Sequence, residues 1–226
     1  MPPYPLAALH ASLAEQLAAL RGVEQDALPA PLLDVVVRRY GELYLIKPAD
    51  WEALRQEEGG AGRGVPYWAR PWPSGLALAA AEPPPAGARV LELGCGLGAP
   101  SIAAAKAGAE VLATDGSTDA VAFAAHALAL NEAVATVAHA DWSEHGATLV
   151  EGGPWDVVLA ADVFYTAANV QTALSLLPRL LERGGELRLA DPGRAGTRDF
   201  LAAARHTFTL RSEPGEDVTL HTLTRR

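Results

Sequence analysis

Hydrophobic spacing near the start of the chain predicts a helix and then a hairpin. Leucines recur every three or four positions between residues 6 and 21, and Gly22 follows them as a stop signal. Two β-rich runs then surround the Tyr40-Gly41 pair, which indicates a hairpin. A short helix is expected over residues 51–57, before the flexible stretch GGAGRG at residues 59–64.

From residue 88 onward, apolar strand-like runs alternate with helical patterns. The expected strands are ARVLELG, EVLATD, ATVAHAD, WDVVLAAD and ELRLAD, and the expected helices cover residues 100–107, 118–131 and 168–183. The last helix should break or kink at Pro178 and end at Gly184-Gly185. Such alternation predicts an α/β fold with a mostly parallel sheet and helices on both of its faces.

The end of the chain has a different pattern. FTLRSEP and DVTLHTLTR flank a turn at Gly215 and indicate an antiparallel pair that finishes the sheet. Taken together, the patterns predict a small α+β accessory region over residues 1–64 and a core domain over residues 65–226.

Composition narrows the class of protein. The chain has 226 residues and a formal charge of −9, so no general basic field favours nucleic acid as a partner. Cys95 is the only cysteine, which excludes an intramolecular disulfide and a multi-cysteine zinc site. Residues 1–20 resemble neither a signal peptide nor a membrane span, so we expect a cytoplasmic protein without a membrane partner.

The main chemical motif is VLELGCGLGAPS, residues 90–101. A buried strand runs into Gly94, Gly96 and Gly98 and then into a helix. Glycines at such a turn let backbone N–H groups approach a ligand at the positive end of the helix. An ordinary turn between a strand and a helix is the alternative interpretation.

Acidic residues follow the glycines at regular intervals. Glu92 lies inside the strand, where an acidic side chain needs a polar ligand or loop N–H groups. Asp115 ends the next strand, where a carboxylate can accept two ribose hydroxyls, as in both NAD enzymes and methyltransferases. Asp141 and Trp142 end the third strand and could bind and cover an adenine, although Asp141 could also be a turn or cap residue.

The fourth strand ends in Asp162, and Phe164 and Tyr165 follow it. At the carboxyl edge of the sheet, this aspartate could accept a hydrogen bond from a substrate amine, while an aromatic ring walls the pocket. A turn carboxylate with core aromatics is the alternative. Upstream, the proline-rich VPYWARPWPSG contains Trp68, for which packing is favoured, and Trp72, which could equally cover a ligand or seal the core.

These motifs resemble the seven-β-strand S-adenosylmethionine-dependent methyltransferases, specifically the family 16 lysine methyltransferase branch, over about residues 65–195. The segments WARPWPSG, ADVFY and ADPGR are similar to W-A-x-x-W-P-G-G, G-D-x-x-Y and D-P-G-R of the electron transfer flavoprotein β-subunit lysine methyltransferases. Ser74 and Ala161 each replace a glycine of these patterns. The resemblance implies a Rossmann-like seven-stranded sheet and S-adenosylmethionine as the cofactor.

The resemblance also implies roles for individual residues. The residues expected at the cofactor are Trp72, Glu92, Gly94, Cys95, Gly96, Gly98, Asp115, Asp141, Trp142 and Asp162. Asp162 would also orient the acceptor amine and Tyr165 would shape its pocket, and no metal is expected. The methyl acceptor would be a lysine of a protein.

Three alternatives remain open from the sequence. The first is a small-molecule N-methyltransferase of the nicotinamide or aromatic amine type, and the second is an NAD-dependent oxidoreductase. The oxidoreductase is disfavoured because the loop reads G-x-G-x-G and no Tyr-x-x-x-Lys pair exists. The third is an inactive binding module with the same fold.

Overall fold

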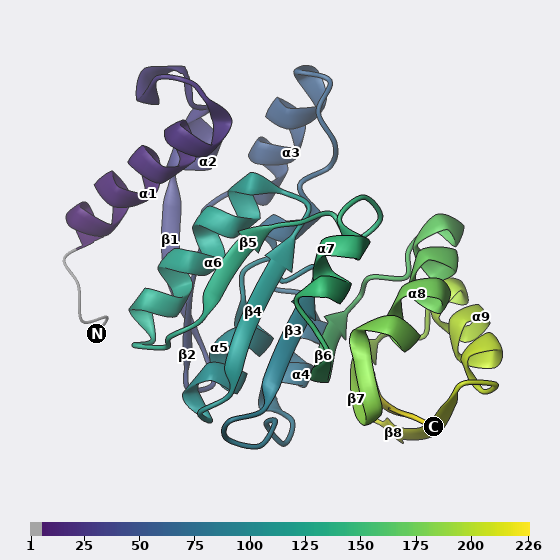
Figure 1. Cartoon of the computed structure of the whole chain (residues 1–226). Coiled ribbons are helices and arrows are strands. Elements are labelled where there is room, and N and C mark those ends of the chain that lie inside the picture. Colours follow the sequence, from purple (N-terminus) through teal and green to yellow (C-terminus); the bar gives the residue numbers. More distant parts are fainter. Residues whose placement is uncertain (1–5) are drawn as a thin grey trace.

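The computed structural model describes residues 6–226. Residues 1–5 of the predicted accessory region lie outside the described residues. The described chain forms a seven-stranded sheet with helices on both faces and a separate two-stranded sheet near the N-terminus (Figure 1). The predicted Rossmann-like α/β fold is therefore confirmed.

The large sheet has the strand order β5-β4-β3-β6-β7-β9-β8. Its strands are β3 (Arg89–Leu93), β4 (Glu110–Asp115), β5 (Thr136–His139), β6 (Trp155–Ala161), β7 (Leu181–Asp191), β8 (Phe208–Pro214) and β9 (Thr219–Arg225). Neighbouring strands are parallel from β5 across β4, β3 and β6 to β7. Strand β9 pairs antiparallel with both β7 and β8. The predicted antiparallel pair at the end of the chain is confirmed.

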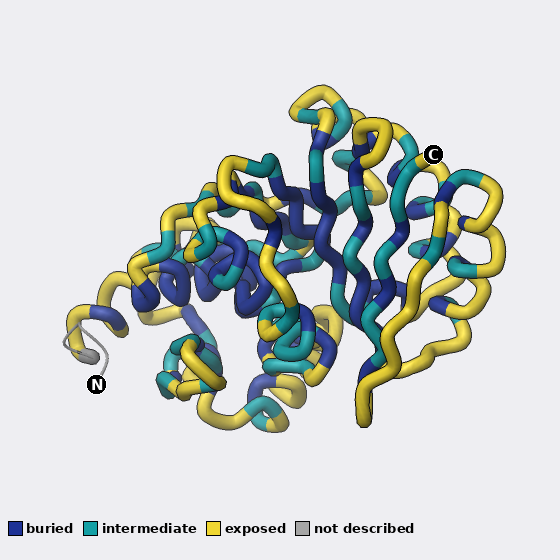
Figure 2. The backbone as a smooth tube through the Cα atoms, turned by 90° about the horizontal axis from the view of Figure 1, so that it is seen from below, coloured by how far each residue is buried: buried dark blue, intermediate teal, exposed yellow. Residues whose placement is uncertain are grey.

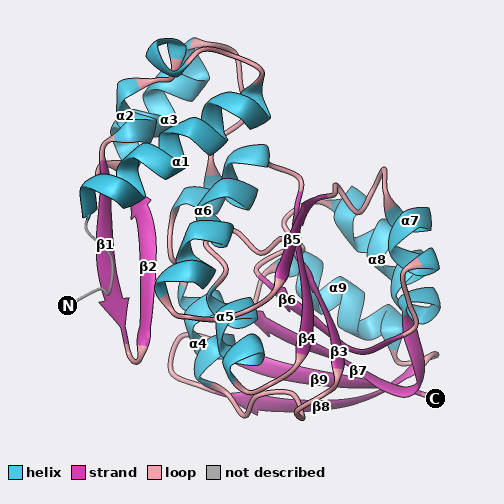
Figure 3. Cartoon of the chain, turned by 60° about the vertical axis from the view of Figure 1, so that its left-hand side comes forward, coloured by secondary structure: helices cyan, strands magenta, loops and turns pink. Residues whose placement is uncertain are grey.

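Two layers of helices enclose this sheet (Figure 3). One layer contains α4 (Pro73–Ala80), α5 (Ala99–Lys106) and α6 (Thr118–Leu130), and the other contains α7 (Gly146–Glu151), α8 (Ala167–Leu180) and α9 (Ala195–Ala204). Alanine-rich α6 buries Phe123 completely, and α8 and α9 bury Val170, Leu177 and Phe200 on the other side. Buried residues accordingly run through the middle of the molecule along the central strands (Figure 2).

The N-terminal region packs on the outside of the first helix layer. Its elements are α1 (Leu6–Arg21), η1 (Gln25–Ala27), α2 (Ala30–Leu33), β1 (Val35–Tyr40), β2 (Leu43–Pro48) and α3 (Trp51–Gly60), and η2 (Tyr67–Ala69) leads into the core. The predicted helix and hairpin are confirmed. Helix α1 and strand β2 both contact α6, and the side-chain amide of Asn131, just after α6, exchanges two hydrogen bonds with the backbone of Tyr44 on β2 (2.9 and 2.6 Å).

Two predicted boundaries are wrong. Helix α3 continues through Gly59 and Gly60, because the N–H of Ala61 still bonds to the carbonyl of Glu57, so the glycine-rich loop begins later than expected. Helix α8 ends at Leu180 rather than at the Gly184-Gly185 pair. Leu181 already pairs with Trp155 on β6, and both residues are buried, so tertiary packing overrides the glycine stop signal.

A buried ion network joins α1 to the core. Arg21 donates to both carboxylate oxygens of Asp119 on α6 (2.8 and 2.5 Å) and to Glu58 on α3 (3.1 Å). All three side chains are at most 16% exposed. Removing this cation would leave the buried Asp119 without its guanidinium partner, whereas Glu58 would keep Arg63, so the pair of Arg21 and Asp119 is a main attachment of the N-terminal region.

We therefore expect Arg21→Met to lower the free energy of unfolding by about 3 to 5 kcal/mol, the usual loss when one partner of a buried ion pair is removed. Urea unfolding measures the change. The matched control is Arg39→Met, which removes a guanidinium from an exposed pair with Glu42 and should change stability by about 1 kcal/mol or less. Equal losses in the two variants would contradict the assigned role of Arg21.

Candidate active site

A cleft lies at the carboxyl ends of the parallel strands and encloses about 630 Å³. Loops after β3, β4, β5 and β6 form its floor, and the segment from Val65 to Leu76 forms a wall. The predicted site residues that line it are Trp72, Glu92, Gly94, Cys95, Gly96, Asp115, Asp141, Trp142, Asp162 and Tyr165. Gly98 is the one predicted site residue that does not line it. Open α/β sheets bind ligands at this edge.

The glycine loop has backbone angles that residues other than glycine adopt with difficulty. Gly94 and Gly96 have φ values of 72° and 52°, in the left-handed region that favours glycine. A Cβ on Gly96 would lie 3.3 Å from the carbonyl oxygen of Trp68. The loop therefore presents backbone rather than side chains to the cleft.

Trp68 packs on Phe123, with ring centroids 4.9 Å apart, as the sequence favoured.

Gly98 has a structural position instead. It is the N-cap of α5 with a φ of 81°, and an added Cβ would lie 3.3 Å from the Cβ of Ala124 on α6. This glycine lets α5 and α6 pack closely. Its predicted contact with a cofactor is therefore not supported by its position.

Asp115 connects the glycine loop to the turn after β4. Its Oδ2 accepts a hydrogen bond from the Gly96 N–H and its Oδ1 from the Ser117 N–H, both at 2.9 Å. Burial raises the pKa of this carboxyl above its ordinary value, although the two N–H donors act in the opposite direction. The side chain also lines the cleft, so a ligand hydroxyl can reach its remaining lone pairs.

Glu92 is buried beneath the glycine loop. It is 1% exposed, and the hydroxyl of Ser101 on α5 donates to its Oε2. Burial raises the pKa of Glu92 to about 8, against the hydrogen bonds from Ser101. The sequence required a polar partner for this residue, and α5 supplies it from within the chain. Burial likewise raises the pKa of the neighbouring Cys95 thiol.

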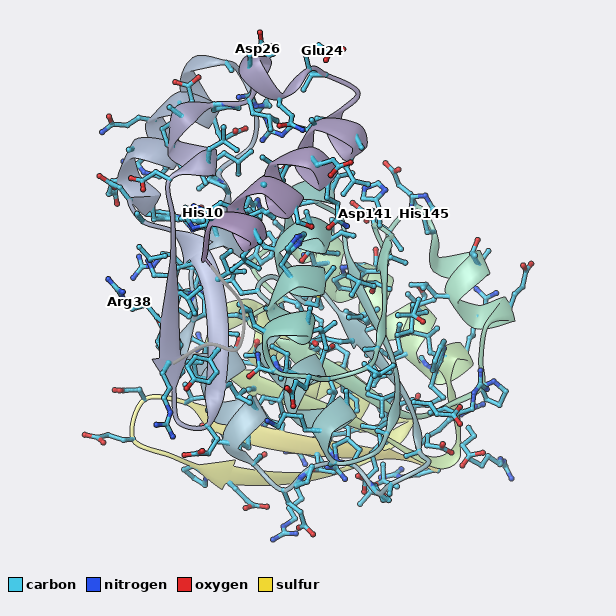
Figure 4. All side chains as sticks on the ribbon, turned by 90° about the vertical axis from the view of Figure 1, so that its left-hand side faces the viewer. His10, Glu24, Asp26, Arg38, Asp141 and His145 are labelled. Atoms are coloured by element: carbon cyan, nitrogen blue, oxygen red, sulfur yellow. The ribbon has the colours of Figure 1, made fainter. Side chains whose placement is uncertain are left out.

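Asp141 has two kinds of contact after β5. Its Oδ1 accepts hydrogen bonds from the N–H (2.8 Å) and hydroxyl (2.5 Å) of Ser143, and its carbonyl oxygen accepts from the N–H of His145 (2.7 Å). Figure 4 shows Asp141 and His145 close together at the end of that strand. The turn interpretation is thus correct for Oδ1. Oδ2 lies near Gly116 and accepts no hydrogen bond from residues 6–226, and the adjacent Trp142 also lines the cleft.

Asp162 is held by two residues for which the sequence motifs indicated no role. Its φ of 64° is unusual for a residue other than glycine. Arg194 donates to its Oδ1 through Nε, and the hydroxyl of Ser74 donates to Oδ2 at 3.3 Å. The motifs WPSG and DPGR contain Ser74 and Arg194, so their pairing with the fourth-strand aspartate was the signal that could have found them.

Aromatic rings surround the mouth of the cleft. The Tyr67 ring centroid lies 6.2 Å from that of Tyr165 and 6.3 Å from that of Trp72. The Trp72 indole N–H donates to the carbonyl of Tyr67 at 2.7 Å, and the guanidinium of Arg70 lies 4.8 Å from the Trp72 ring. Tyr67 and Tyr165 are 52% and 60% exposed. No motif in the sequence indicated a role for Tyr67.

Two classes of feature are not found in residues 6–226. No group of three or more histidine, cysteine, aspartate or glutamate side chains is arranged to hold a metal ion in this part of the chain. Among the same residues, no helix combines the length and hydrophobicity that a membrane span needs.

The raised pKa of Glu92 predicts a specific pH dependence. Because the folded pKa of about 8 lies above the ordinary 4.5, the folded state binds a proton that the unfolded state lacks between these values. The free energy of unfolding should therefore fall as the pH rises from about 5 to 8. In Glu92→Gln this part of the fall should disappear, because the amide does not titrate.

Urea unfolding at pH 5, 6, 7 and 8 measures both slopes. The control is Glu110→Gln at the exposed start of β4, which should keep the wild-type slope. Parallel curves for wild type and Glu92→Gln would show that Glu92 is ionised in the folded protein.

Comparison with known proteins identifies the family. A model of the lysine methyltransferase family matches residues 78–201, more than half of the chain. The electron transfer flavoprotein beta subunit lysine methyltransferase of Xenopus laevis is 38% identical over 138 residues, which cover 58% of this chain and 54% of that protein. The protein of the same name from Danio rerio is 34% identical over 139 residues, covering 59% and 53%. The chain thus spans about half the length of these curated relatives.

A solved structure supports the fold. The 16S rRNA methyltransferase RsmC from T. thermophilus, in complex with AdoMet and guanosine, superposes with a TM-score of 0.62 at 20% sequence identity. The match covers 85% of this chain and 50% of that one. The family match is consistent with the glycine loop and with the acidic residues at the strand ends. The chain belongs to the lysine methyltransferase family.

Proposed function

We propose that this protein is an S-adenosylmethionine-dependent N-methyltransferase that acts on a lysine side chain of a protein. One observation carries the proposal: Asp115, Asp141 and Asp162 follow three different strands and line one cleft beside the glycine loop. Family membership and the two relatives named as lysine methyltransferases support the choice of reaction and acceptor.

The cleft residues fit S-adenosylmethionine. Gly94 and Gly96 present backbone at a place where a Cβ would be crowded, Asp115 has lone pairs left for ribose hydroxyls, and Asp141 Oδ2 and Trp142 suit an adenine amino group and ring. When bound, the cofactor supplies a methyl group activated by its sulfonium. These residues would hold the cofactor in the cleft that Asp162 also lines.

The protein's own contribution is to position the amine. Asp162 accepts a hydrogen bond from the acceptor nitrogen and so directs its lone pair, while Tyr67, Trp72 and Tyr165 surround the lysine stem and reduce the access of water. The neutral amine would take the methyl group as the sulfur–carbon bond breaks with its electron pair going to sulfur, and the proton lost by the lysine would go to water. Such positioning is worth about 7 to 11 kcal/mol in favourable cases.

The open mouth favours a protein acceptor over a small amine. Of residues 6–60, only Leu45 lines the cleft, so the described N-terminal region forms no lid over it. A small-molecule enzyme usually encloses most of its ligand. The exposed Tyr67 and Tyr165 could instead receive a lysine that projects from a protein surface. A cytoplasmic location and the absence of nucleic-acid and membrane partners stay predictions.

Radiolabelled S-adenosylmethionine tests the proposal directly. The protein is incubated with it in an extract of its own organism, and label is followed into protein bands and into small molecules. Label in a protein band, located by acid hydrolysis to methylated lysine, is the expected result. Label in the small-molecule fraction alone would favour the small-amine alternative, and no label would contradict the proposal.

Calorimetry should show binding of S-adenosylhomocysteine and little or no binding of NAD. Asp115→Ala should weaken the binding by about 1 to 3 kcal/mol, the range for a lost hydrogen bond to a charged group. Glu110→Ala, at the exposed start of the same strand, serves as the control and should bind normally. Tight binding of NAD alone would support the oxidoreductase alternative.

Asp162→Asn should lower turnover at least tenfold while leaving the affinity for S-adenosylhomocysteine within a few fold. Asparagine tolerates the left-handed backbone and keeps an acceptor oxygen, but it lacks the charge and loses the ion pair with Arg194. Label incorporation and calorimetry measure the two quantities. Loss of cofactor affinity together with activity would make Asp162 a cofactor residue.

A further inference from the structure

The Asp162 carboxylate is held from two sides by segments far apart in the sequence. Ser74, in the first turn of α4, donates to Oδ2 at 3.3 Å. Arg194, at the N-cap of α9, donates to Oδ1 through its Nε. The backbone N–H of Asp162 donates to the carbonyl of Ala190 at the end of β7 (3.0 Å). The two carboxylate oxygens and the backbone N–H of this residue are therefore each bonded to a different element.

The backbone of Asp162 indicates that this arrangement is specific. Its φ of 64° is a left-handed conformation that costs energy outside glycine. Such a conformation persists where the surrounding contacts determine it, and it is common at functional sites. The side chain is only 10% exposed, whereas that of Arg194 is 40% exposed at the edge of the cleft. The contacts thus hold Asp162 in one orientation.

The DPGR turn in turn fixes Arg194. Asp191 is fully buried, and its Oδ1 accepts hydrogen bonds from the N–H groups of Gly193 and Arg194, both at 2.7 Å. The next turn presses against the segment that follows Asp162, because a Cβ on Gly196 would lie 2.3 Å from the carbonyl oxygen of Phe164. The distance between the start of α9 and Asp162 is therefore tightly constrained.

Charge explains why a cation at this place is useful. A protonated lysine has no lone pair for a nucleophilic attack, and its ordinary pKa is about 10.4. A carboxylate without a counter-charge would favour the protonated amine and raise that pKa further. A guanidinium on the same carboxylate offsets this effect and leaves Asp162 able to accept a hydrogen bond.

We propose that Arg194 is a positioning residue for methyl transfer, which fixes the Asp162 carboxylate and offsets its charge so that the acceptor lysine binds as a neutral amine. The inference rests on the proposed function and adds to it a residue and a task. In this chain the segments WPSG and DPGR each supply one hydrogen bond to the same carboxylate.

Other charged and titratable groups near this end of the cleft have different positions. Asp191 Oδ1 accepts the N–H groups of the DPGR turn, and its buried Oδ2 has no hydrogen-bond partner among residues 6–226. Arg70 stacks on Trp72, Arg198 donates to the carbonyl of Gly193, and Glu92 lies under the glycine loop, where burial raises its pKa. Tyr67 and Tyr165 face the mouth, and α4 and α8 contribute the non-titrating Ser74 and Asn169. Among residues 6–226, the cation that forms an ion pair with Asp162 is Arg194.

The test compares wild type, Arg194→Gln and Arg194→Lys with a matched control, Arg205→Gln. Arg205 is exposed at the far end of α9 and makes no side-chain hydrogen bond to residues 6–226, so its loss removes the same charge away from the cleft. Initial rates of label transfer into the protein band of the extract are measured at saturating S-adenosylmethionine from pH 6.5 to 10. Calorimetry with S-adenosylhomocysteine and thermal unfolding check that each variant is folded.

We expect Arg194→Gln to lower the rate at least tenfold at pH 7 and to move the acidic limb of the profile upward by about one pH unit or more. The difference in rate from wild type should shrink toward pH 10. High pH removes the proton that the charge of Asp162, no longer offset by Arg194, would keep on the acceptor lysine. Arg194→Lys should recover most of the wild-type profile, and Arg205→Gln should match wild type. Because Glu92 titrates in every variant, the difference between profiles isolates Arg194.

The outcomes separate the two proposals. A wild type that labels a protein, together with an Arg194→Gln profile that is unchanged or lowered equally at every pH, would overturn the inference and leave the proposed function standing. A loss of S-adenosylhomocysteine affinity in Arg194→Gln would overturn it too, since Arg194 would then be a cofactor residue. A wild type that labels no protein would contradict the proposed function and the inference with it.

Discussion

The register of three parallel strands is the constraint on which the cleft depends. Leu93 at the end of β3 pairs with Thr114 on β4 and with Ala160 on β6. The chain therefore leaves the three strands at one level, which brings Gly94, Asp115 and Asp162 to the same edge. Because β4 and β6 lie on opposite sides of β3, their loops diverge there and leave space between them.

The same register places acidic groups where water is scarce. Glu92 and Asp115 both have pKa values raised by burial, and each is stabilised differently: Glu92 by a hydroxyl from α5, and Asp115 by two backbone N–H groups. Asp162, farther along the edge, is paired with a guanidinium instead. Three carboxyl groups of one cleft thus meet three kinds of partner, although Asp115 still contributes to the raised pKa of Glu92.

Much of this arrangement could be predicted from the sequence because local signals agree with the fold. The strands are short apolar runs, and a carboxylate directly after such a run must lie at the sheet edge, which placed Asp115 and Asp162 correctly. The hairpin near Tyr40-Gly41 carried an equally local signal. Their roles toward a cofactor and an acceptor stay predictions.

The rest depended on contacts between distant segments. The DPGR motif singles out the segment of Arg194 but not its ion pair with Asp162, 32 positions away, and nothing near Gly98 shows that this residue packs against α6. The end of α8 was misplaced because Leu181 joins β7 through burial, against the local preference of the glycine pair. Helices α7 and α9 were not predicted, and neither was the short α2.

The hydrogen bonds of Asn131 have a consequence for the sequence of the hairpin. Its amide offers the backbone of Tyr44 one donor and one acceptor, as a neighbouring strand would. The hairpin, which also packs on α6 through β2, is thereby joined to the core without lengthening the large sheet. Because both bonds go to the backbone of Tyr44, they do not depend on the side chain at that position. Substitutions there can therefore leave this attachment intact.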